Sequence, residues 1–152
     1  MTMYQHRGFT MIELVLMLVI LGILSAFALP RFFNTDTFEN RGFYTEVINA
    51  VRYAQQYAVA TNCETQISFS ANTYTVNIWD GGACGVGTLN GDTPNPVTGE
   101  AGFSGTNSTA TITSAPNSFT FNALGQADNN VNVSVGGYSF TVHNETGYIE
   151  EL

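Results

Sequence analysis

A single carboxylate, Glu13, lies at the beginning of a long apolar segment, and its position is the strongest indication of chemistry in this sequence. Residues 14–29 contain no charged side chain. As a helix, residues 9–29 would measure about 31 Å, which is long enough to cross the hydrocarbon core of a bilayer. A charged side chain within such a segment costs about 2.5–3.5 kcal/mol on insertion. The pattern therefore predicts that Glu13 has a function of its own.

Two simpler interpretations of the apolar segment are a plain membrane anchor and a secretory signal peptide. A signal peptide has a cationic start, an apolar stretch of about 7–15 residues and a cleavage site between small residues. Arg7 would supply the charge and Ala26-Phe27-Ala28 the cleavage site. However, the apolar stretch is long for a signal peptide, and Glu13 lies between the charge and this stretch, where a signal peptide gains nothing from it.

The order of residues at this terminus resembles the signature of type IV prepilins. A short leader ends in Gly8, Phe9 follows it, Glu13 comes four residues after Phe9, and the apolar segment continues from there. In type IV pilins and the related type II secretion pseudopilins, a membrane-embedded aspartyl peptidase cuts after the glycine and methylates the new N-terminus. The resemblance implies cleavage between Gly8 and Phe9, N-methylation of Phe9, and a leader that stays in the cytoplasm.

The resemblance also implies roles for Glu13 and Pro30. Glu13 would pair with the N-terminal amine of a neighbouring subunit during assembly, and removing one member of a buried ion pair costs about 3–5 kcal/mol. Glu13 would therefore select the axial register between subunits and is not a catalyst. Pro30 would kink the long helix without ending it. The implied organisation is a cleaved leader at 1–8, a transmembrane and assembly helix at 9–30, and a periplasmic or extracellular domain at 31–152.

The two cysteines, Cys63 and Cys84, both lie outside the apolar segment. If this segment enters the membrane from the cytoplasm, the rest of the chain lies in a compartment where disulfides form. A bridge between the two would add roughly 3 kcal/mol of stability in the chain-entropy model. A metal site would need further Cys or His residues, and none is close in sequence. We expect a structural disulfide, with two free thiols as the alternative.

The remaining polar residues give little indication of catalysis or metal binding. His143 would be the one histidine left after cleavage, which makes a zinc site or a Ser-His-Asp triad a weak hypothesis. Residues 90–92 and 128–130 offer Asn and Asp oxygens to calcium, but neither has the spacing of a defined calcium loop. We expect turns at both places, and we expect no metal, no cofactor and no enzyme activity.

The charge of the chain argues against one class of partners. Its 152 residues include 12 acidic residues, four arginines and no lysine, which gives a net charge of −8. Cleavage after Gly8 would remove Arg7 and leave a side-chain charge of about −9. Because affinity for phosphate backbones comes from Lys and Arg, we expect the domain to bind neither nucleic acid nor anionic lipid.

The domain is large enough to bury a core.

Beyond Pro30 the sequence predicts one amphipathic helix, at residues 38–62. Residues 34–37 offer capping side chains before it. Apolar residues then recur at helical spacing, and the stripe contains Tyr44, Val47, Ile48, Val51, Ala54, Gln55 and Ala58. The small side chains on the later turns suit a helix that lies close against a sheet.

From residue 65 onward the pattern changes to the alternation that is typical of β-strands. Strands are predicted at 66–70, 74–79, 109–113, 118–122, 131–135, 138–143 and 148–150, with turns at 71–73, 136–137 and 145–147. Residues 80–107 are rich in Gly, Asn, Thr and Pro, which predicts a long surface loop with one short strand at 85–89. Trp79 is expected in the core. One helix on an antiparallel sheet or sandwich gives an α+β domain, with strands between residues 65 and 150.

Segments of this domain resemble one branch of the pilin family. They are residues 30–33, 41–44, 52–55, 119–125, 138–142 and 146–149. They look like the H-type pseudopilin and FimT-like minor pilin branch, and within it they are most similar to minor pilins of the mannose-sensitive haemagglutinin type. The resemblance implies a minor pilin that inserts in the bacterial inner membrane with its C-terminal domain in the periplasm. Such a pilin assembles by its N-terminal helix into a cell-surface pilus, or into the tip or initiation complex of one.

The expected partners are other major and minor pilins, the prepilin peptidase and the inner membrane. Two alternative functions stay open at this point. One is a membrane-anchored, adhesin-like binding module that uses the loop at 80–107, and the other is a minor pseudopilin of type II secretion. Glu13 and the apolar segment favour assembly, whereas adhesion depends only on a long polar loop.

Overall fold

The structure is a computed structural model that describes residues 8–32 and 35–152, without the side chains of residues 26–32 and 35. The chain divides into two compact units, Met1–Thr35 and Asp36–Leu152. Each unit is described by itself. The predicted leader at 1–8 lies outside the described residues except for Gly8.

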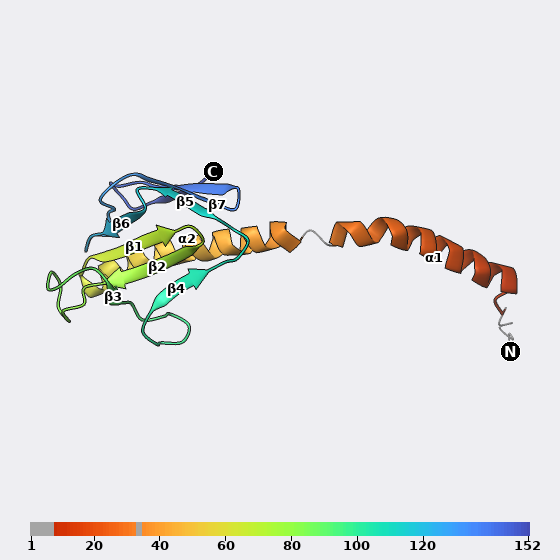
Figure 1. Cartoon of the computed structure of the whole chain (residues 1–152), viewed down its shortest axis with the longest axis horizontal. Helices are drawn as coiled ribbons and strands as arrows, with labels where there is room; N and C mark the ends of the chain where they lie inside the picture. Colours follow the sequence, from red (N-terminus) through yellow and green to blue (C-terminus); the bar gives the residue numbers. More distant parts are fainter. Residues whose placement is uncertain (1–7, 33–34) are drawn as a thin grey trace, which may run out of the picture. The chain divides into compact units, whose positions relative to one another are not determined.

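The first unit contains one helix, α1, at Met11–Phe32 (Figure 1). Thr10 caps its N-terminus, because the backbone N–H of Glu13 donates to the Thr10 Oγ1 at 3.3 Å and to the Thr10 carbonyl at 3.1 Å. The helix continues through Pro30 and ends two residues later. Since the side chain of Pro30 is outside the description, the kink expected there stays a prediction.

No helix within residues 8–32 and 35–152 combines the length and the apolar character that crossing a membrane requires.

The second unit begins with α2 at Thr35–Thr61, three residues earlier than the helix predicted at 38–62. Its buried face confirms the predicted stripe, with Gln55 only half-buried at its edge. The buried residues of α2 are Phe43, Tyr44, Val47, Ile48, Ala50, Val51, Ala54 and Ala58. Because alanines occupy the later turns, the backbone of α2 can approach the strands closely.

The C-terminus of α2 closes in a Schellman motif. Asn62 adopts a left-handed backbone with φ of 53°. The N–H of Cys63 donates to the carbonyl of Ala58 at 3.1 Å, and the N–H of Asn62 donates to the carbonyl of Val59 at 3.4 Å. These bonds satisfy carbonyls that the helix end would otherwise leave free, and they turn the chain so that Cys63 leads into the first strand.

Among the described residues, two antiparallel sheets follow α2 (Figure 1). Their strands are β1 (Thr65–Ser70), β2 (Thr73–Ile78), β3 (Gly91–Asp92), β4 (Phe103–Thr106), β5 (Ile112–Ala115), β6 (Ser118–Phe121), β7 (Val131–Val135), β8 (Tyr138–Val142) and β9 (Ile149–Glu151). In the first sheet β6 pairs with β1, β1 with β2, and both β3 and β4 with β2. The second sheet has the order β5-β7-β8-β9.

Aromatic side chains connect α2 to both sheets. The Tyr44 ring lies 6.0 Å from Phe140 on β8, and the Phe43 ring lies 6.2 Å from Tyr74 on β2. The strands alternate as predicted, and on β7 Val131, Val133 and Val135 are buried while the residues between them are exposed. The α+β prediction is therefore confirmed.

Several strand predictions need correction. Residues 85–89 do not form a strand, because Gly85 and Gly87 have positive φ and the segment is almost fully exposed. The predicted surface loop at 80–107 instead contains β3 and β4, both paired with β2. The strand expected at 109–113 lies at 112–115. Trp79 is half-buried and not part of the core. The other predicted strands are confirmed within one residue at each end.

Candidate functional site

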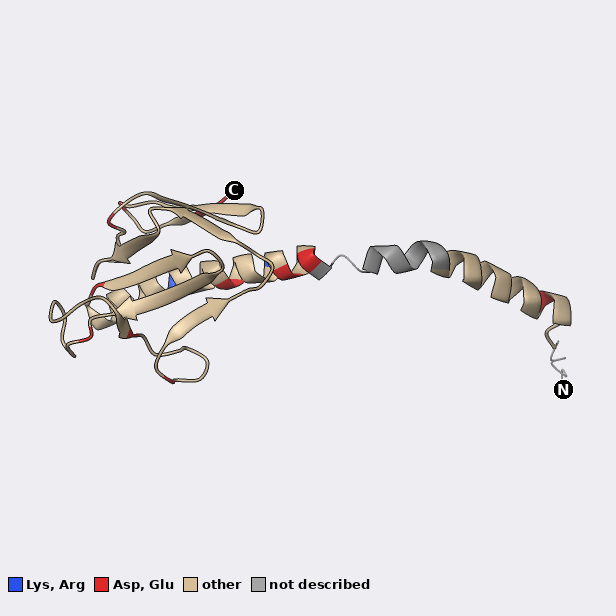
Figure 2. Ribbon diagram, viewed as in Figure 1, with Lys and Arg blue, Asp and Glu red and all other residues tan. Residues whose placement is uncertain are grey.

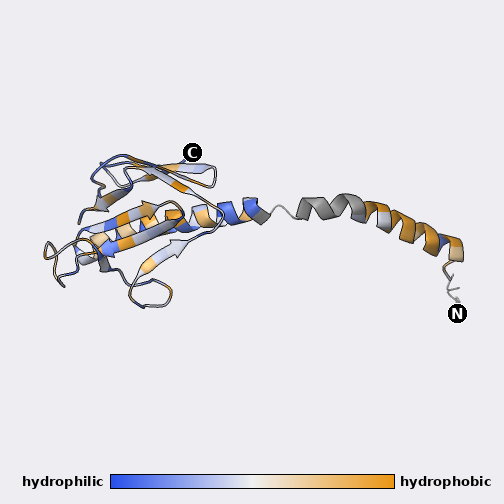
Figure 3. Cartoon of the chain, viewed as in Figure 1, coloured by the Kyte–Doolittle hydropathy of each residue, from blue (hydrophilic) through white to orange (hydrophobic). Residues whose placement is uncertain are grey.

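The described part of α1 is apolar on all sides and exposed. Phe9 is 73% exposed, and the large apolar residues from Met11 to Leu24 are 48–85% exposed. Figure 3 shows this part of the helix as almost uniformly hydrophobic. A helix that is hydrophobic all round is normally buried, either in the core of an assembly or in a membrane. Within the described residues of the first unit, nothing covers this apolar surface.

Glu13 is the one charged residue in the described segment 8–25, and the acidic colour appears near the start of α1 in Figure 2. It occupies the third position of α1, where a carboxylate interacts favourably with the positive end of the helix dipole. Within the described residues its carboxylate has no hydrogen bond and no ion pair. The carboxylate is free to accept a donor from another molecule.

Thr10 is a residue that the sequence analysis did not identify. Thr10 and Glu13 have the spacing of a capping box, in which Ser or Thr precedes Glu or Gln by three residues. In the structure Thr10 makes its half of this pattern. This spacing was the available sequence signal, but only the Thr10 half of the box forms, since the Glu13 carboxylate accepts no hydrogen bond within the described residues.

The predicted processing site lies just before α1. Gly8 and Phe9 are exposed and not helical. Open space surrounds Gly8, since a Cβ placed there would meet no atom within 4 Å. An exposed, irregular segment is the kind of backbone that proteases can reach.

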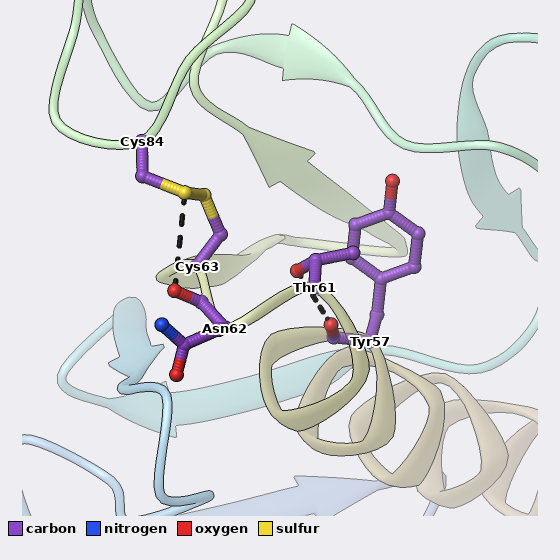
Figure 4. The surroundings of a disulfide bond; sticks show 5 residues. All are labelled: Tyr57, Thr61, Asn62, Cys63 and Cys84. Carbon is purple, nitrogen blue, oxygen red and sulfur yellow. Dashed lines mark hydrogen bonds between the residues drawn. A yellow bond between two sulfur atoms is a disulfide. The ribbon is translucent and has the colours of Figure 1, made fainter.

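Cys63 and Cys84 form a disulfide with their Cα atoms 5.4 Å apart (Figure 4), as the sequence predicted. The bridge joins the end of α2 to the segment that follows β2. This segment also has bonds of its own, because Asp80 accepts the backbone N–H of Thr88 at 2.7 Å and its hydroxyl at 2.9 Å. These hydrogen bonds lower the pKa of the Asp80 carboxyl.

The other polar positions considered in the sequence have structural partners. His143 Nε2 lies 2.9 Å from Glu150 Oε2 on the surface. Asp128 accepts the N–H of Thr120 at 3.2 Å, and Asn130 accepts the N–H of Asn144 at 2.9 Å, so these oxygens bond within the fold. Residues 128–129 form a bend, whereas the turn expected at 90–92 is wrong in part, because Gly91 and Asp92 form β3. Across residues 8–32 and 35–152, no three His, Cys, Asp or Glu side chains gather as a metal site.

Two family models match this chain. Residues 45–148, about two thirds of the chain, match the type II transport protein GspH. Residues 3–29 match the prokaryotic N-terminal methylation motif. A curated relative, the type IV narrow pilus major component PilA5 of Thermus thermophilus, is 44% identical over 57 residues, which are 38% of this chain and 47% of that protein. The chain thus spans about half the length of the curated relative that it matches.

Two crystal structures of the type IV minor pilin FimU from Pseudomonas aeruginosa have a similar fold. One has a TM-score of 0.55 and covers 78% of this chain and 91% of FimU. The other has a TM-score of 0.50 and covers 71% of this chain and 88% of FimU. Sequence identity is 14% in both, so the likeness concerns the fold alone.

Proposed function

Because this chain belongs to the GspH family of type II transport proteins and is a type IV pilin-like protein, we propose that it is a minor pilin that assembles through its N-terminal helix. The observation that carries the proposal is the surface of α1. It is apolar on every side, exposed over the described residues, and interrupted by a single carboxylate. Lipid covers this surface before assembly, and neighbouring helices cover it afterwards.

Processing by a prepilin peptidase is the first part of the proposal. The enzyme cuts between Gly8 and Phe9 and methylates Phe9, and the match to the methylation motif together with the exposed, irregular backbone there supports this step. Mass spectrometry of the mature chain should find N-methylated Phe9 as the first residue. A mature chain that begins at Leu29, after the small-residue site, would establish a secretory signal peptide and contradict the proposal.

Pairing of Glu13 with the terminal amine of a neighbouring subunit is the second part. A carboxylate and an amine among apolar helices each need a partner, because an unpaired buried charge is strongly destabilising. The pair forms in one axial register, which is how Glu13 aligns subunits.

Three variants test this role of the Glu13 charge. Glu13→Gln removes the charge but keeps the size and a polar end, Glu13→Ala removes both, and Glu145→Gln, at an exposed site outside α1, is the control for loss of one negative charge. All three should enter the membrane. Co-purification with partner pilins should fall for both Glu13 variants and not for the control. If Glu13→Gln co-purifies as well as wild type, the charge has no role in register.

The proposed location follows from this chemistry. The chain is held in the bacterial inner membrane by residues 9–30, with its folded domain in the periplasm, and is then incorporated into a surface filament. The disulfide between Cys63 and Cys84 suits these oxidising compartments. The proposed role is structural, with other pilins as partners.

The adhesin-like alternative is not favoured. It depended only on a long polar loop at 80–107, yet β3 and β4 in this segment pair with β2 and Thr93 is buried. A minor pseudopilin of type II secretion is the second candidate, because the GspH match covers most of the domain. Both candidates use α1 in the same way. Deletion of the gene should reduce surface pili in the first case and the export of secreted enzymes in the second.

A further inference from the structure

A groove of about 480 Å³ runs along one side of the second unit, between α2 and the segment that connects β3 to β4. Glu46 and Tyr53 of α2 line one side, Val97 lines the opposite side, and Tyr74 and Phe103 lie at its base in β2 and β4. All residues that line the groove belong to the second unit.

The wall formed by the connecting segment is held in place by hydrogen bonds. The Tyr53 hydroxyl donates to the carbonyl of Pro94 at 2.6 Å and ties the segment to α2. The Asn95 side chain accepts the N–H groups of Val97 at 2.9 Å and Thr98 at 3.3 Å. Val97, in the same connecting segment, is 89% exposed. Its apolar side chain therefore does not pack in the core. The shape of the groove is therefore built before any ligand arrives.

Aromatic rings supply the apolar surface of the groove. The Tyr53 and Phe103 rings meet edge to face at 5.0 Å, and the Tyr74 and Phe103 rings do so at 5.9 Å. Tyr53 and Phe103 are only partly buried. Such faces attract aliphatic chains because they are apolar, and they attract cations because the face of an aromatic ring is negative.

Glu46 is the one charged residue among those that line the groove. Its Oε1 accepts the hydroxyl of Tyr74 at 2.8 Å, and Tyr74 is 1% exposed, so the carboxylate is anchored to the core. Within the described part of the chain, Glu46 has no ion pair with a basic residue. An anchored carboxylate beside aromatic faces therefore lacks a cation.

We propose that this groove binds a basic side chain, arginine or lysine, that a different protein presents. The cationic group pairs with Glu46, and the aliphatic stem lies on the rings of Tyr53 and Phe103 and against Val97. Arginine suits the groove well because its planar guanidinium both accepts stacking on aromatic faces and pairs with carboxylates. A second copy of this chain is a poor source, since it has no lysine and four arginines against 12 acids. The proposal stands independently of assembly through α1.

The test uses the full mature chain in detergent micelles and nuclear magnetic resonance of its backbone amides. The probe is N-acetyl-arginine methylamide, and the matched neutral probe is N-acetyl-citrulline methylamide. The arginine probe should shift the resonances of the groove residues in a saturable way, and the citrulline probe should not. Glu46→Gln should weaken binding roughly tenfold, as expected for loss of a charged hydrogen bond. Glu145→Gln, which removes the same charge from an exposed site elsewhere, should leave binding unchanged.

A second variant covers the case in which Glu46→Gln alters the fold. Asn49 lines the groove one turn after Glu46, so Asn49→Arg should place a cation of the chain itself beside Glu46 and block the probe. Equal shifts from arginine and citrulline probes would overturn the proposal. Binding of guanidinium chloride as tight as that of the arginine probe would also overturn the proposal, because the groove would then be a site for small cations.

Discussion

Replacing Cys63 and Cys84 together by serine should lower the free energy of unfolding of the second unit by about 3 kcal/mol. The cysteines are 21 residues apart. Closing a loop of this length removes unfolded-state entropy worth about 3 kcal/mol at 25 °C in the chain-entropy model. Without the bridge, the unfolded state of the double variant recovers this entropy and becomes more stable, whereas the free energy of its folded state should not fall.

The folded state should change little, because each end of the bridge has other bonds. The Schellman motif closes α2 before Cys63. On the other side, Asp80 and Thr88 hold the segment of Cys84 through two side-chain hydrogen bonds. The cost should therefore arise in the unfolded chain, and amide resonances of the variant should move only near the two substitutions.

The assay is urea unfolding of residues 36–152, monitored by circular dichroism. This fragment contains every buried residue of the core. With a urea m-value of about 1–3 kcal/mol/M, the transition midpoint should fall by roughly 1–3 M. Ala60→Ser, an exposed serine substitution on α2, controls for the change of residue type. Coincident midpoints for the double variant and wild type would refute the reasoning, as would widespread loss of native resonances in the absence of urea.

Three further predictions concern the second unit. Residues 36–152 alone should fold as a soluble acidic monomer with dispersed amide resonances, and an unfolded fragment would mean that residues before 36 belong to the core. Phe140→Ala should cost about 3–5 kcal/mol in urea titrations because its ring is fully buried, whereas Phe38→Ala, at an 82% exposed residue, should cost less than about 0.5 kcal/mol. Burial and the hydrogen bond to Glu46 raise the pKa of the Tyr74 hydroxyl in the folded state. The stability that this hydroxyl contributes is therefore complete below about pH 10, which is the pKa of tyrosine in the unfolded chain. Above that pH the free energy of unfolding should fall by about 1.4 kcal/mol per pH unit. Tyr74→Phe should reduce that alkaline loss, and an unchanged pH profile would contradict this assignment.

Local patterns were enough to predict much of this protein. Gly8, Phe9 and Glu13 stand at fixed distances along the chain, so their signature needs no tertiary information. The buried face of α2 follows from a 3.6-residue period, and β7 follows from strict alternation, because each pattern arises from one element facing one core. Cys63 and Cys84 were predicted to pair from their compartment and their number.

Contacts between distant segments decided the rest. The segment at 80–107 has turn residues and no alternation, yet β4 forms in it because Phe103 and Gly105 pair with Val76 and Tyr74 on β2. Gly105 has no Cβ, and a Cβ there would collide with the Tyr74 ring and the carboxylate of Glu46. That close approach brings β4 against α2 and creates the groove. A short strand in a polar, glycine-containing segment depends on its partner's backbone for its hydrogen bonds, so only the folded chain could reveal it.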